Sequence, residues 1–172
     1  SMIDTADGAY QEVHSMLLRM REIAVQASNG TLSGADRTAL NAEVTALETE
    51  ITSIADNTAF AGIKLGTGLS VAFQIGTAQG VTLSHKFADF DVSAIGANIA
   101  VNSVSTANSA LATIDGAIST VSANRGTLGA LSNRLSSTIA NLDNISVNLS
   151  SARGRIQAVS YTHLRAHETG IN

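Results

Sequence analysis

Apolar residues recur every three or four positions along three segments of this chain, a spacing that places them on one side of a helix. The stripe begins at Ile3, starts again at Leu40 after a break, and returns at Val104. Because such a stripe is narrow, it favours long helices that lie along each other over a globular core. We therefore predict an elongated, mainly α bundle with coiled-coil-like packing. Its helices are expected over residues 2–28, 33–57 and 103–157.

The period of the apolar residues changes between the second and third helical segments. Val71, Phe73 and Ile75 occupy every second position, and another run of this kind begins at Val81 after two glycines. A period of two indicates extended strands, so a β-hairpin is predicted over residues 69–88. A third short extended piece is expected within residues 90–95.

The composition excludes several classes of protein. A length of 172 residues suits one domain, or one domain with a tail. The chain has no cysteine, which excludes thiolate metal sites and a cysteine nucleophile. Its net charge is -4 and its basic residues are scattered, a pattern that speaks against nucleic-acid binding. No apolar run approaches the ~20 residues of a membrane span, so no membrane contact is expected.

Three local patterns could suggest chemistry, and each has a simpler explanation. His163 and His167 stand four apart, but no Glu lies between them as in zinc proteases. Asp89 and Asp91 form a carboxylate pair without a visible cleft, and the Gly-Thr-Gly run at residues 66–68 lacks the lysine of a phosphate loop. We therefore expect no catalytic, cofactor or metal site, and no enzyme.

One cationic residue interrupts the third apolar stripe. Arg125 occupies a position within it, next to Gly126 and near Gly129. One interpretation is a local overwinding of the coil, with Arg125 reaching out past the stripe. The other is a polar contact that sets helix register, or a subunit contact that requires small residues nearby. The sequence leaves both open.

Several stretches of the chain resemble bacterial flagellins. The first predicted helix carries TADGA from residue 5 and LRMREIAVQASNGT from residue 18. After the second helix, NTAFAGIKL from residue 57 is similar to a family segment that usually contains Gln-Phe-Asn-Gly. The resemblance covers most of residues 1–157 in the family's order. In the third helix it rests on ALATID from residue 110, LGALSNRL from residue 128 and NLSSARGRIQ from residue 148.

This resemblance implies a structural subunit of the extracellular flagellar filament, which serves motility. Such a subunit polymerises with other flagellin subunits, uses the flagellar export machinery, and has no cofactor. In the family, innermost helices would precede residue 1 and follow residue 157, and without them polymerisation is not expected. The alternative is a hook–filament junction adaptor protein of the same wider family. The RMREIAVQA block from residue 19 favours flagellin.

The resemblance also implies a receptor-binding face. Flagellins of the stimulatory type are recognised by Toll-like receptor 5 through the first helix and the facing second helix. Motif alignment places the family's contact positions at Arg19, Ile23 and Glu43. Because Arg19, Glu22, Ile23 and Gln26 share a face beside the apolar stripe, we expect them to be available to a partner. Alternatively, this face contacts only neighbouring subunits.

The last fifteen residues depart from the family. AVSYTHLRAHET from residue 158 resembles the translated sequence of a transposase adapter used in DNA library preparation. We therefore expect residues 1–157 to form the flagellin core domain. Residues 158–172 are expected to be a non-native tail without a biological role.

Overall fold

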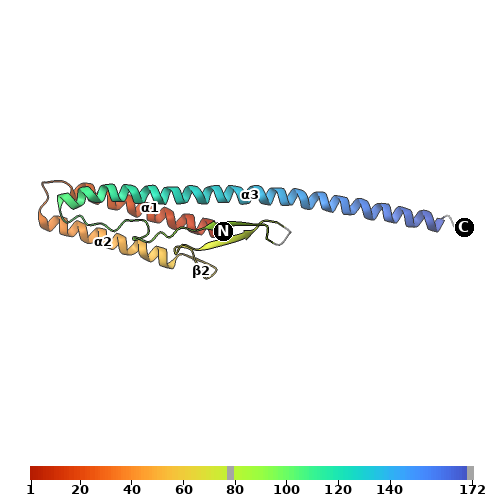
Figure 1. Cartoon of the computed structure of the whole chain (residues 1–172), viewed down its shortest axis with the longest axis horizontal. Coiled ribbons are helices and arrows are strands. Elements are labelled where there is room, and N and C mark those ends of the chain that lie inside the picture. Colours follow the sequence, from red (N-terminus) through yellow and green to blue (C-terminus); the bar gives the residue numbers. More distant parts are fainter. Residues whose placement is uncertain (77–79, 170–172) are drawn as a thin grey trace. The chain divides into compact units, whose positions relative to one another are not determined.

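The computed structural model describes residues 1–76 and 80–169, with the backbone alone for residues 160–169 (Figure 1). The described part is mainly helical and has two small two-stranded sheets, which confirms the predicted fold class. Its helices are α1 (Met2–Ala27), α2 (Gly34–Asn57) and α3 (Val104–Thr169), and its strands are β1 (Ala59–Phe60), β2 (Ile63–Lys64), β3 (Ser70–Gln74) and β4 (Thr82–Lys86).

The chain divides into two compact units. The first consists of Ser1–Phe73 and Leu83–Ser132, and it contains α1, α2, the β1–β2 sheet and the beginning of α3. The second consists of Gln74–Thr82 and Asn133–Asn172. The buried apolar side chains belong to the first unit, which therefore holds the core.

One arginine holds the connection between α1 and α2 together through hydrogen bonds to its backbone. Ser33 caps α2, and Asp36 reaches back to the Ser33 amide, so the two residues form a capping box. Arg37 in the first turn of α2 donates hydrogen bonds to three backbone carbonyls, one at the end of α1 and two in the connection. The last carbonyl of α1 thereby finds a partner that the helix itself cannot supply. The acceptors are Ala27 at 3.0 Å, Leu32 at 2.9 Å and Asn29 at 2.8 Å.

The apolar stripe of α1 is buried along its whole length, but it is wider than the sequence suggests. Ala9 and Ile23, outside the predicted stripe, are buried with it. Besides α2, α1 has neighbours from later in the chain: Tyr10 contacts Ala88 and Phe90 after β4, and Arg21 is ion-paired with Asp115 of α3. A helix with several neighbours buries a broader face than one helix of a two-stranded coil.

Tyr10 ties α1 to the segment that follows β4. Its side chain is 1% exposed, and its hydroxyl donates a hydrogen bond of 2.8 Å to the carbonyl of Ala88. Its ring lies 4.6 Å from the ring of Phe90, centre to centre. Burial, with a smaller contribution from the carboxylate of Asp89, raises the pKa of Tyr10 to about 12.

The raised pKa of Tyr10 predicts alkaline sensitivity. The folded chain holds the phenol proton more tightly than the unfolded chain, whose tyrosine titrates near 10.0. The resulting stability is complete below about pH 10 and is lost as the pH rises through about 12. We expect Tyr10→Phe to weaken this decline, measured by urea unfolding between about pH 8 and about pH 12. Parallel declines in parent and variant would contradict the assignment.

Strands β3 and β4 lie within the predicted hairpin. At one end, the amide of Phe87 donates to the carbonyl of Leu69 at 2.7 Å, and near the other the amide of Ile75 donates to Val81 at 2.9 Å. The third extended piece expected within residues 90–95 is wrong. There the carboxylate of Asp91 accepts from the Ala94 amide at 2.6 Å, which closes a turn in place of a strand.

The β1–β2 hairpin was not anticipated from the sequence. Phe60 pairs with Ile63, and Ala59 pairs with Lys64. The two turn residues, Ala61 and Gly62, have positive φ angles of 52° and 81°, as a tight two-residue hairpin requires. Strands of two residues are too short to show an alternating pattern, so the glycine was the only available signal.

Threonine hydroxyls are bonded to the helix backbone along α2 and α3. Each donates to the carbonyl four residues earlier, a local bond that fixes the side chain against its own helix. Most of these threonines lie on exposed positions. They are Thr38, Thr45, Thr49 and Thr52 in α2, and Thr113, Thr120, Thr127 and Thr138 in α3.

Candidate functional site

Arg19 and Glu43, two of the three predicted receptor-contact residues, are joined across α1 and α2. Arg19 Nε donates to Glu43 Oε1 at 2.8 Å, and Nη2 lies 2.7 Å from the same oxygen. Arg19 Nη1 also donates to Glu22 Oε2 at 3.1 Å. These carboxylates, Glu43 above all, raise the pKa of Arg19. The side chains of Arg19 and Glu43 are 50% and 42% exposed, so the cluster is open to a partner.

Ile23, the third predicted contact residue, is fully buried. The expectation that it is available to a partner is therefore wrong, because the buried face of α1 is wider than the apolar stripe and includes this side chain. The apolar side chains exposed near Arg19 are instead Leu18 and Val25, at 43% and 49%. We call Leu18, Arg19, Glu22, Val25 and Glu43 the Arg19 face.

Two further ion pairs connect α1 to α3. Arg125 holds Asp7 with two bonds, Nε to Oδ1 at 2.8 Å and Nη2 to Oδ2 at 3.2 Å, and Asp7 raises the pKa of Arg125. Arg21 Nε donates to Asp115 Oδ1 at 2.7 Å. The acid is on α1 in the first pair and on α3 in the second, so a shift of either helix by one turn would separate both pairs.

This geometry favours the polar-contact interpretation of Arg125. All four side chains are between a third and about half exposed, and pairs of that kind contribute roughly 0.2–1 kcal/mol each. Their main effect is therefore on the alignment of the helices. A Cβ on Gly126 or Gly129 would meet no atom within 4 Å, so packing within the described chain does not require either glycine.

The other patterns considered in the sequence have backbone roles where the structure describes them. Asp89 accepts a hydrogen bond from the Asp91 amide at 3.2 Å, and Asp91 closes the turn described above. Gly66 lies against the backbone of Ala55. His163 and His167 lie outside the residues whose side chains are described.

The described residues contain no group of three or more histidine, aspartate or glutamate side chains arranged to hold a metal ion. None of the helices, over these residues, combines the length and apolar character needed to cross a membrane.

A pair of helices from the first third of the chain, in one unit with the start of a long carboxy-terminal helix, defines a mainly helical protein built from long helices. Family models agree with this class. The bacterial flagellin N-terminal helical region matches residues 1–70, and the bacterial flagellin C-terminal helical region matches residues 111–167. The chain belongs to the bacterial flagellin family. Flagellins are structural proteins, which confirms the prediction that this is not an enzyme.

Individual relatives show how much of the family's length is present. A flagellin of Halalkalibacterium halodurans is 44% identical over 164 residues, which cover 92% of this chain and 60% of that protein. The crystal structure of Bacillus cereus flagellin aligns with a TM-score of 0.74 at 30% identity, over 82% of this chain and 84% of that one. The chain thus spans 60% of the first relative, and its match covers 22% of flagellin E of Vibrio cholerae.

A putative flagellar hook-associated protein from Vibrio parahaemolyticus has the same fold. It aligns with a TM-score of 0.70 over 89% of this chain and 84% of that one, at 16% identity. A likeness at that identity concerns the fold alone.

Proposed function

We propose that this chain is a structural subunit of the bacterial flagellar filament, which assembles with other flagellin subunits after passage through the flagellar export machinery. The observation that carries the proposal is the match of both helical regions of flagellin, the N-terminal one to residues 1–70 and the C-terminal one to residues 111–167. Flagellin homologues form the extracellular flagellar filament, and the same location is proposed here.

The hook–filament junction adaptor is the alternative function. Its support is the fold of the hook-associated protein, at 16% identity. The flagellin assignment has stronger support, because the 44% identical relative is a flagellin. Filament incorporation tests the choice, since an adaptor would bind filament ends in preference to entering the shaft.

We also propose that residues 1–157 form the flagellin core domain and that residues 158–172 are a non-native tail. The adapter-like sequence after Gln157 supports this division. The family-model match extends to residue 167, so it overlaps the first part of the proposed tail. A chain that ends at Gln157 is therefore included in the assembly experiment.

In that experiment, neither the full chain nor the chain ending at Gln157 is expected to form filaments alone. Both are expected to copolymerise with a full-length flagellin. The reason is that this chain spans 60% of a relative's length, so it offers only part of the surface over which subunits meet. Electron microscopy and sedimentation of labelled chains measure both outcomes.

Three results would count against these proposals. Straight or supercoiled filaments of the chain alone would contradict the assembly prediction. A lack of incorporation into the filament shaft would contradict the subunit function. Unequal incorporation of the two chains would show that the tail is not neutral.

We propose in addition that the Arg19 face is recognised by Toll-like receptor 5. Arg19 presents a planar five-donor fork that is half exposed, with the carboxylate of Glu43 beside it. Leu18 and Val25 supply exposed apolar area on the same helix. Ile23 would act from beneath, by holding α1 in place, because it has no surface of its own.

Arg19→Ala is expected to weaken receptor binding at least about tenfold, since truncation of a buried interface arginine often costs ~2 kcal/mol or more. His163→Ala, in the proposed tail, is expected to leave binding unchanged. Surface plasmon resonance on the receptor ectodomain measures both affinities, and thermal unfolding checks that each variant is folded.

The same variants separate the two interpretations of this face. Equal affinities for Arg19→Ala and the parent, or no binding by the parent, would refute receptor recognition. If Arg19→Ala impairs copolymerisation while leaving receptor affinity unchanged, the face contacts neighbouring subunits instead.

A further inference from the structure

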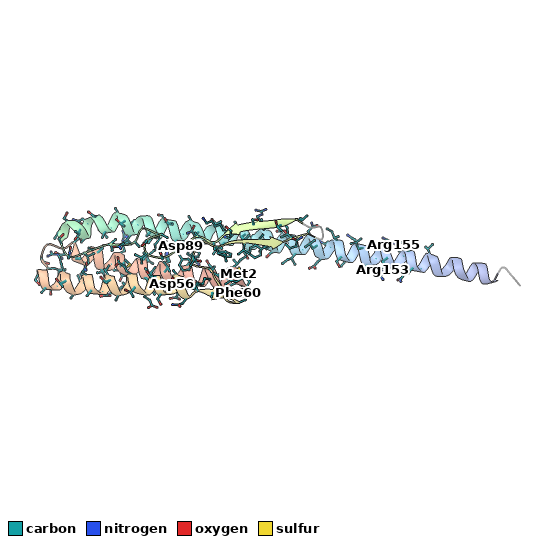
Figure 2. The ribbon with its side chains drawn as sticks, turned by 60° about the horizontal axis from the view of Figure 1, so that its bottom comes forward. Met2, Asp56, Phe60, Asp89, Arg153 and Arg155 are labelled. Carbon is teal, nitrogen blue, oxygen red and sulfur yellow. The ribbon has the colours of Figure 1, made fainter. Side chains whose placement is uncertain are left out.

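The connection between α1 and α2 contains the only Asn-Gly pair in the sequence, Asn29 and Gly30. Both residues are exposed. In Figure 2 the connection lies at the end of the first unit that is away from Met2 and Phe60. A Cβ on Gly30 would meet no atom within 4 Å, so the space around this residue is open. The backbone and the side chain of the pair are therefore accessible to water.

The side chain of Asn29 is folded over the peptide bond that follows it. Its Oδ1 accepts one hydrogen bond from the Thr31 amide at 3.1 Å and another from the Thr31 hydroxyl at 3.0 Å. The Gly30 amide comes before the Thr31 amide in the chain, so a side chain that reaches Thr31 brings its Cγ next to the Gly30 nitrogen. Among the described residues, neither the Gly30 amide nor the Asn29 Nδ2 donates a hydrogen bond.

We propose that Asn29 and Gly30 form a self-modification site, at which the asparagine is deamidated through a cyclic imide. The Gly30 nitrogen forms a bond to Cγ of Asn29 and gives up its proton. The bond from Cγ to Nδ2 breaks, and ammonia leaves with that proton. Water then adds to one of the two carbonyls of the imide and opens it, which yields aspartate or isoaspartate at position 29. Overall, water is consumed and ammonia is released.

Thr31 supplies the stabilisation that the ring closure requires. When the Gly30 nitrogen attacks Cγ, negative charge develops on Oδ1 of Asn29. The amide and the hydroxyl of Thr31 already donate to that oxygen, at 3.1 Å and 3.0 Å. Paired donors at such distances are the means by which enzymes stabilise an oxyanion in acyl transfer. The same two bonds keep the side chain in the conformation that can close the ring.

Two Asp-Gly pairs, at residues 7–8 and 115–116, lack this arrangement. They lie within α1 and α3. Inside a helix, the glycine amide donates to the carbonyl four residues earlier and is not available for attack. Each of the two carboxylates is also held by an arginine in an ion pair. We therefore expect isoaspartate at position 29 and not at positions 7 and 115.

The isoaspartate product meets a cation that is already in place. In this product the main chain continues through Cγ, and the former backbone carbonyl of residue 29 becomes a free carboxylate. Arg37 Nη2 donates to the oxygen of that carbonyl at 2.8 Å. The hydrogen bond to a neutral carbonyl thus becomes an ion pair, which is the stronger contact. The modification adds negative charge to the connection and leaves its contact with Arg37 in place.

Incubation of the full chain at mildly alkaline pH tests the proposal. Peptide mass spectrometry and an isoaspartate-specific methyltransferase assay are expected to detect conversion at position 29 in the folded parent. Gly30→Ala is expected to slow it at least about tenfold, because the added Cβ crowds the attacking nitrogen and alignment of the reacting atoms governs the rate. This variant fits the fold, since Gly30 has neither a positive φ angle nor a close neighbour.

A pair of substitutions at Thr31 isolates its hydroxyl. Thr31→Val keeps the shape of the side chain and is expected to slow conversion about fivefold, which corresponds to the loss of a hydrogen bond of about 1 kcal/mol. Thr31→Ser retains the hydroxyl and is expected to convert at the parent rate. In concentrated urea the connection has no fixed geometry, so Thr31→Val and the parent are expected to convert equally.

The site is overturned if the folded parent keeps Asn29 intact after the urea-unfolded parent has converted, because the fold would then protect the pair. The role of Thr31 is overturned if Thr31→Val converts at the parent rate in the folded state, or if its difference from the parent persists in urea. Isoaspartate at positions 7 and 115 at the level of position 29 would refute the selectivity. These measurements use the chain alone, so their outcome is independent of the proposed filament function.

Discussion

Replacing Tyr10 with alanine is expected to lower the free energy of unfolding by about 4 kcal/mol. The change removes a ring that is 1% exposed, its contact with Phe90, and the hydrogen bond to the Ala88 carbonyl. It leaves a cavity between α1 and the segment after β4. A domain of this size has a free energy of unfolding of roughly 5–15 kcal/mol, so this single change removes a large share of it. Urea unfolding followed by circular dichroism measures it.

Two controls separate the parts of this effect. Tyr10→Phe keeps the ring and removes only the hydroxyl, so it is expected to cost about 1 kcal/mol. Leu18→Ala truncates an exposed side chain on the same helix and is expected to cost less than about 0.5 kcal/mol. If Tyr10→Ala proved no more costly than Leu18→Ala, the central position of Tyr10 in the core would be refuted.

The second large effect is expected from Gly66→Ala, with a loss of about 3 kcal/mol. A Cβ at this position would collide with the backbone of Ala55, meeting its carbonyl oxygen and coming within 2.8 Å of its carbonyl carbon. Backbone atoms near the end of α2 cannot move aside as a flexible side chain can. The chain after β2 would therefore have to shift away from the helix.

A glycine with open surroundings provides the matched control for that experiment. Gly116 lies within α3 and would meet no atom within 4 Å, so Gly116→Ala is expected to stabilise the chain by up to about 1 kcal/mol. Thermal unfolding compares the two variants with the parent. Equal stability of Gly66→Ala and the parent would show that the close approach to Ala55 is not structurally important.

The helices could be predicted because their apolar stripes are long. The number of segments that pack against each helix could not be predicted. For that reason the burial of Ile23 is not evident from the sequence. A stripe shows which side of α1 is apolar, but not how many neighbouring segments cover it. The hairpin of β3 and β4 was recognised by its alternation, whereas the two-residue strands around Ala61 and Gly62 carry no period at all.

The candidate surface was predictable only in part. Arg19 and Glu43 were selected from family motifs, and a short connection between α1 and α2 is enough to bring them together. The partner of Arg125 could not be foreseen in this way, because Asp7 is 118 positions away and several acids on α1 were equally plausible.

The threonines bonded to their own helices have a consequence for the entropy of association. A lysine or glutamate that is immobilised at an interface loses rotamer freedom worth about 1.5–2 kcal/mol. A threonine whose hydroxyl already holds the carbonyl one turn earlier, as Thr45 and Thr120 do, has less freedom left to lose. Eight threonines of α2 and α3 are held in this way. Where a neighbouring molecule covers one of them, the side chain adds less to the ordering penalty than a long charged side chain would.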